Sequence, residues 1–115
     1  MSVQFLQLLE KYLDLASTRH TLVSTNIANI DTPGYRTRDV DFRGELAHFM
    51  NDTGTSFDAV ARPVSGLLER PDGNNVSMDR EALALSESQV QFQIGVQLIR
   101  REFNRLLNAI NEDKS

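Results

Sequence analysis

The sequence predicts a mainly α-helical protein in which two long terminal helices pair as an antiparallel-type coiled coil, with a small irregular, β-containing middle. One observation is that chain-breaking residues gather in the middle: all three prolines lie between Pro33 and Pro71, and five of the six glycines between Gly34 and Gly73. A second is that both ends carry apolar residues at alternating spacings of three and four. That repeat is typical of helices that bury one stripe against another.

The first helix is expected over residues 3–30. Its apolar seam is broken by two polar entries, Arg19 and Asn26, and consists of Phe5, Leu9, Tyr12, Ala16, Val23 and Ile30. Thr32 precedes Pro33 and is therefore disfavoured in helical conformation, so the helix is expected to stop near residue 29 or 30. A flank beside the seam holds Leu8, Leu13, Leu15, Leu22 and Ile27.

The second long helix is expected over residues 79–111, with Ser77 or Asp79 as its cap. Its seam has the single polar entry Gln89 and consists of Leu85, Phe92, Val96, Ile99, Phe103, Leu106 and Ile110. A further apolar flank holds Leu83, Val90, Ile94, Leu98 and Leu107. Because two paired helices bury only one face each, we expect the flank residues of both helices to pack against neighbouring molecules.

The chain is thus expected to divide into residues 1–35, 36–76 and 77–115, with the first and last parts forming one helical domain. In the middle part, Phe42, Leu46 and Phe49 recur at helical spacing and predict a short helix capped by Asp41. In residues 56–61, polar and apolar residues partly alternate, and this pattern predicts a strand. Residues 64–76 are rich in Gly, Pro and Asp and predict turns and loop.

Composition excludes several classes of function. With 12 basic and 16 acidic residues in 115, the net charge is −4, and no basic block points to a nucleic-acid partner. There is no cysteine, hence no disulfide or thiolate metal site. No apolar run approaches the roughly 20 residues that span a bilayer. The N-terminus lacks the basic leader and long apolar centre of a cleaved secretory signal.

We find no pattern that predicts an enzyme, a cofactor, a metal site or a small-molecule substrate. The two histidines, His20 and His48, lie in different segments without ligand spacing. The pair Asp39 and Asp41 suits a helix cap or turn better than a cation site.

The most unusual stretch is Asn26-Ile-Ala28-Asn29-Ile-Asp31-Thr32-Pro33-Gly34-Tyr35. Asn26 and Asn29 place amide groups on the last helical turn, where carbonyls need donors. Pro33 and Gly34 fit the central positions of a type II turn, in which the second residue needs a positive φ. We therefore expect a helix end with a defined exit.

This stretch resembles the N-terminal signature of the bacterial flagellar axial proteins of the rod and hook group. Residues 38–42, and residues 72–81 with the helix that follows, are similar to the proximal rod members of that family. By this resemblance, the signature residues Asn26, Ala28, Asn29, Asp31, Thr32, Pro33, Gly34 and Tyr35 are expected to serve interaction. The chain is also short by comparison, and the missing residues are expected between 50 and 71.

The resemblance implies a structural subunit that assembles helically with itself and other rod subunits to transmit torque from motor to hook. It further implies contacts with the basal-body adaptor protein and the membrane ring, and a place in the periplasmic space. Export through the type III apparatus, without a cleaved signal, is implied as well.

An alternative is a helical regulator or export chaperone or adaptor that binds one protein partner. The apolar stripes permit both functions, whereas the signature favours the assembly subunit. For such a subunit we expect frayed ends in isolation, because helices held by apolar stripes need a neighbour's surface to offset their ordering entropy.

Overall fold

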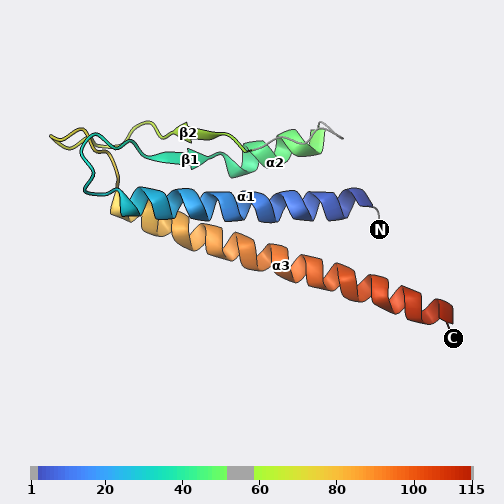
Figure 1. Ribbon diagram of the computed structural model, residues 1–115. Coiled ribbons are helices and arrows are strands. Elements are labelled where there is room, and N and C mark those ends of the chain that lie inside the picture. Colours follow the sequence, from blue (N-terminus) through green and yellow to red (C-terminus); the bar gives the residue numbers. More distant parts are fainter. Residues whose placement is uncertain (1–2, 52–58, 115) are drawn as a thin grey trace.

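The computed structural model describes residues 3–51 and 59–114. The elements follow in the order α1 (Val3–Ala28), β1 (Arg38–Val40), α2 (Phe42–Asn51), β2 (Ala61–Pro63) and α3 (Met78–Lys114). Figure 1 shows α1 and α3 running antiparallel along an elongated molecule with extents of 70 × 26 × 16 Å. The mainly helical fold with paired terminal helices and a small β-containing middle is as predicted. No helix in the described ranges is long and apolar enough to cross a membrane.

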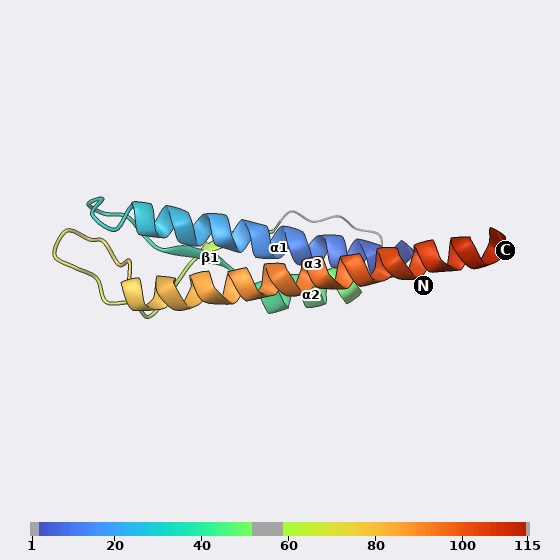
Figure 2. The ribbon, with the colours of Figure 1, turned by 90° about the horizontal axis from the view of Figure 1, so that it is seen from below.

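Helix α1 is the central element of the molecule. It contacts α3 on one side and both α2 and β1 on the other, and Figure 1 shows it between these two layers. Its buried residues are Leu9, Leu15, Ala16, Val23 and Asn26. Helix α3 packs mainly against α1, and Figure 2 shows that it continues past the N-terminal end of α1. The two long helices therefore differ in how much of their surface is covered.

The helix ends follow local rules that the sequence displays. Helix α1 ends at Ala28, ahead of Pro33, as expected. Asp41 caps α2, since its Oδ1 accepts from Gly44 N at 3.1 Å. Ser77 caps α3, since its Oγ accepts from Arg80 N at 3.3 Å.

The two strands pair antiparallel with Arg38 opposite Pro63 and Val40 opposite Ala61. The strand expected over residues 56–61 is corrected here: Ala59 and Val60 lie outside any strand, and β2 begins only at Ala61. Residues 56–58 lie outside the described residues. Strand β1 was not expected, because three residues between a turn and a helix cap show no alternation. Residues 64–76 hold no helix or strand, as predicted.

Helix α3 meets α1 through small and polar residues that recur every seven positions: Glu81, Ser88, Gly95 and Glu102, all buried. Asn26 of α1 contacts Glu81, and Tyr12 lies against Gly95. Each pair of positions is two heptads apart on its own helix, so the antiparallel register is constant. A Cβ on Gly95 would lie 2.6 Å from Leu13 Cδ2, which shows how closely the helices approach there.

The expected seam residues fall into two groups. On α1, Leu9, Ala16 and Val23 are buried and Phe5 and Tyr12 are half-buried, while Ile30 is half-buried in the turn after α1. On α3, Leu85, Val96, Ile99 and Leu106 are half-buried, whereas Phe92, Phe103 and Ile110 are 44%, 56% and 51% exposed. Within one subunit, the apolar stripe of α3 therefore lies beside the contact with α1 and not at its centre.

Candidate functional site

The signature leaves α1 through a type II turn. Tyr35 N donates to Thr32 O at 3.2 Å, and Gly34 has φ +76°, as expected for the third residue of such a turn. Asp31, Thr32, Pro33 and Gly34 are exposed, as is Ala28. This part of the signature forms an exposed rim at one end of the molecule.

Gly34→Val is expected to destabilise the subunit by roughly 1–2 kcal/mol, because a β-branched residue is strained at positive φ. A Cβ at this position meets no atom within 4 Å, so the cost comes from the backbone alone. Thermal melting of the purified subunit measures it. Gly34→Asn is the control, since asparagine tolerates this region better. Equal losses for Val and Asn would contradict a backbone origin.

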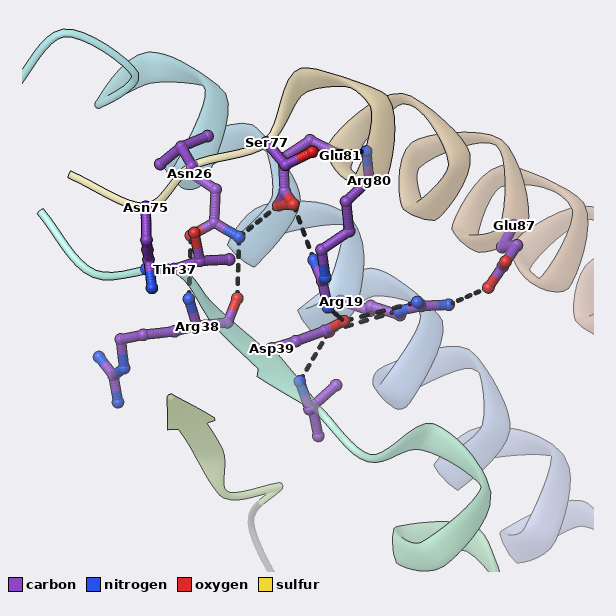
Figure 3. Close-up of polar contacts among 12 residues, drawn as sticks. Arg19, Asn26, Thr37, Arg38, Asp39, Asn75, Ser77, Arg80, Glu81 and Glu87 are labelled. Carbon is purple, nitrogen blue, oxygen red and sulfur yellow. Dashed lines mark hydrogen bonds and ion pairs between the residues drawn. The ribbon is translucent and has the colours of Figure 1, made fainter. Parts of the chain in front are cut away.

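In the other part of the signature, Asn26 is buried, and Asn29 and Tyr35 are half-buried. The Asn26 side chain is fully buried, and its Nδ2 donates to Arg38 O at 2.8 Å and to Glu81 Oε1. Its Oδ1 accepts from Tyr35 OH at 2.8 Å and from Arg38 N at 3.3 Å. Burial raises the pKa of Tyr35, opposed by Arg38 and reinforced by Glu81, so the phenol keeps its proton for Asn26. Asn26 thus joins α1, β1 and α3 (Figure 3).

The carbonyls after α1 find their donor in a distant loop. Asn74 Nδ2 lies 2.9, 3.0 and 2.9 Å from the carbonyl oxygens of Asn29, Ile30 and Thr32. We expected Asn26 and Asn29 to serve the last turn. Asn29 does so, donating to Thr25 O at 2.8 Å, whereas the amide of Asn26 points across to β1 and α3. The adjacent pair of asparagines after Asp72-Gly73 was the available signal for this second role.

A cluster of charges lies beside Asn26, as Figure 3 shows. Arg19 contacts Asp39 at 3.3 Å and Glu87 at 2.8 Å, and Arg80 contacts Glu81 at 2.7 Å and also Asp39. Burial by itself lowers the pKa of Arg19, but hydrogen bonding and the charges of Glu87 and Asp39 raise it overall. The pKa of Arg80 is raised in the same way by Glu81 and Asp39. Both arginines therefore stay charged, and the cluster ties β1 to the two long helices.

The arrangement offers structural contacts rather than a reaction centre. Asp41 is a helix cap, as the sequence favoured, whereas Asp39 lies in β1 and is an ion-pair partner, a role the sequence did not predict. His20 and His48 are exposed on different helices. Within residues 3–51 and 59–114, no group of three or more His, Cys, Asp or Glu side chains could hold a metal ion.

Helix α3 exposes apolar side chains in several directions. Leu83 and Val90 are 62% and 53% exposed, and they lie about 140–160° around the helix from Phe103. Ile94, Leu107 and Ile110 are exposed as well, while Leu98 is half-buried. On α1, by contrast, the flank residues Leu8, Leu13, Leu22 and Ile27 are half-buried. The expectation that this flank packs against neighbouring molecules is wrong for Leu15, which the subunit itself buries. A helix that is apolar on several sides is normally surrounded by partners.

The subunit is elongated, its segments are joined by internal hydrogen bonds and ion pairs, and α3 exposes apolar side chains on several sides. These features define a building block of a larger assembly. The chain is 33% identical over 122 aligned positions to the flagellar basal body rod protein FlgB of Salmonella typhimurium, covering 88% of each chain. It is 35% identical to that of Cereibacter sphaeroides (85% of this chain, 87% of the relative) and 27% to that of Escherichia coli (88% of each). The chain therefore belongs to the FlgB family of flagellar basal body rod proteins. No family model matches it.

The resemblance seen in the signature is thereby confirmed, and the protein is a structural subunit of the flagellar basal body rod. Nothing in the comparisons favours a regulator or chaperone. The Salmonella alignment spans 122 positions, more than the 115 residues of this chain. That relative therefore carries residues that this chain lacks, as the sequence led us to expect.

Proposed function

We propose that the subunit assembles helically with copies of itself and with other rod subunits through the exposed faces of α3, and so transmits torque from motor to hook. One observation carries this: apolar side chains lie on nearly opposite sides of α3, at Leu83 and at Phe103. A single partner covers one side of a helix, whereas neighbours in a helical assembly cover several. Full burial of each such side chain contributes roughly 1.5–3 kcal/mol.

The shape of the subunit supports a mechanical role. Helix α3 has 37 residues and α1 has 26, which correspond to about 55 and 39 Å. The two are joined side by side, and the charge cluster of Arg19, Asp39 and Arg80 fixes β1 against both. Residues 1–35 and 77–115 would form the helical domain that carries load, and residues 36–76 an arm folded back along α1. We assign this chain no catalytic role, cofactor or small-molecule substrate.

Family membership and the signature support a more specific location, set of neighbouring proteins and export route for the subunit. We place the subunit in the periplasmic part of the basal body, next to the basal-body adaptor protein and the membrane ring. We infer that it travels there through the type III export apparatus without a cleaved signal.

The absence of cysteine from the chain allows a direct test. Phe103→Cys and Leu83→Cys are each introduced alone, and basal bodies from the two strains are treated with a photoactivatable cross-linker that bonds to the single thiol and, on illumination, inserts into any adjacent polypeptide. Both positions are expected to cross-link to neighbouring rod subunits, while the purified monomers stay uncross-linked. If only one of the two positions cross-links, a single covered face, and with it a single-partner protein, replaces the proposal.

A further inference from the structure

We propose that the buried part of the signature works within one subunit: Asn26 and Tyr35, with Asn74 and Glu81, form a clasp that closes one end of the molecule. We further infer that this end is folded before the subunit enters the rod. The second statement rests on the proposed function, because it concerns a subunit that assembles. The first does not.

The hydrogen bonds of Asn26 are all satisfied inside the chain. An asparagine side chain offers two N–H donors and one oxygen that accepts twice. In this structure the donors go to Arg38 O and Glu81, and the oxygen accepts from Tyr35 and from Arg38 N. With its side chain fully buried, Asn26 has no group left for a neighbouring subunit.

The clasp joins two segments that are far apart in the sequence. Asn74 Nδ2 serves the carbonyls of residues 29, 30 and 32, and Asn75 Oδ1 accepts from Thr37 N at 2.7 Å. Gly34 N donates to Asp72 O at 2.8 Å. Residues 26–38 and 72–81 therefore form one hydrogen-bonded unit, of which Figure 3 shows the part around Asn26, Arg38 and Glu81.

At the opposite end of the helix pair, α3 leaves more apolar surface in water, since Phe103, Leu107 and Ile110 are 56%, 55% and 51% exposed. The polar contacts of Asn26 and Arg19 with α3 fall on Glu81 and Glu87, in its first ten residues. Further along, Gly95 contributes no side chain, and the carboxylate of Glu102 pairs with Arg105 of its own helix at 2.8 Å. Val3 is 70% exposed. Fraying should therefore begin at the start of α1 and the end of α3 and stop at the clasp.

Hydrogen exchange on the purified full-length subunit tests the second statement. Amides in residues 26–38 and 74–88 are expected to exchange at least about tenfold more slowly than those in residues 3–10 and 103–112. Equal exchange along the whole chain, whether fast or slow, would overturn the claim that the clasp end folds first.

Substitutions that change the hydrogen-bonding groups of Asn26 and Glu81 test the first statement, that the clasp forms within one subunit. Asn26→Asp sets a carboxylate against Glu81 and Arg38 O, so residues 26–38 should lose their protection. Adding Glu81→Gln restores a donor, so the double variant should regain part of it. Asn108→Asp is the matched control, the same change at an exposed position of α3, and should leave these amides unaffected.

The outcomes separate the clasp from the proposed function. If Asn26→Asp leaves exchange unchanged yet keeps the subunit out of the rod, the signature binds between subunits and the clasp is wrong. If Glu81→Gln recovers nothing, the pairing of Asn26 with Glu81 is wrong. Neither result alters the cross-linking expected at Phe103 and Leu83.

Discussion

Replacing Phe103 by aspartate is expected to keep the subunit out of the rod while leaving the isolated subunit folded as before. Phe103 is 56% exposed in the single subunit, so a charge there stays in water until assembly. A neighbour that covers this face gains about half of the roughly 1.5–3 kcal/mol that full burial of a phenylalanine contributes, because the side chain is already half-buried. It would pay several kcal/mol for burying an unpaired carboxylate instead. Swarming motility and the content of purified basal bodies measure entry into the rod, and circular dichroism measures the fold.

The next residue provides the control. Asn104 is also exposed and lies on another side of α3, so Asn104→Asp introduces a charge one position away without placing it on the apolar face. We expect that subunit to be incorporated and the cells to swim. Normal motility with Phe103→Asp would show that the face remains open to water in the rod, and α3 would then need a different role.

The sequence predicted those features that a few neighbouring residues decide. Helix α1 ended ahead of Pro33, and Asp41 capped α2 and Ser77 capped α3, each cap through a contact three residues away. Gly34 took the positive φ that its place after Pro33 requires. Local rules of this kind need no knowledge of the rest of the chain.

The face of α3 that meets α1 could not be predicted in the same way. The apolar stripe through Phe92 and Phe103 is the stronger pattern, yet α1 lies against Glu81, Ser88 and Gly95. That choice depends on pairs such as Asn26 with Glu81, which are 55 residues apart in the chain. A helix read alone shows which side is apolar. It does not show which side will be buried against another helix through a polar contact with that helix.

Only part of the candidate site could be predicted from the sequence, again because contacts between distant segments leave no local pattern. The signature stood out because its asparagines, proline and glycine lie close together in sequence. Its partner loop looked like an ordinary turn, since the role of Asn74 depends on carbonyls 42 to 45 residues earlier. Burial divides the signature further, with Asn26 inside and Asp31 to Gly34 outside, and spacing alone carries no sign of that division.

The Gly95→Leu variant opposes two effects at residue 95: the intrinsic helix propensity of the residue, and its packing against α1. In an isolated helix, leucine is favoured over glycine by somewhat less than the roughly 0.8–1 kcal/mol that separates alanine from glycine, so the helix alone predicts stabilisation. In the subunit, the new Cβ would lie 2.6 Å from Leu13 Cδ2 and 3.0 Å from Tyr12 Cδ1. Overpacking of this kind costs typically about 1–3 kcal/mol. The clash outweighs the preference, so we expect the free energy of unfolding to fall, as measured by urea denaturation of the full-length subunit.

Gln97→Leu is the matched variant, because Gln97 is exposed two residues further along the same helix. It adds the same side chain without a clash, so its effect should stay within about 0.5 kcal/mol. The sign of the Gly95 effect also reports how far the helix pair extends from the clasp. A destabilised Gly95→Leu subunit means that α1 and α3 already touch at the midpoint of α3 before assembly. A stabilised one means that they do not, because only the helix preference would then remain.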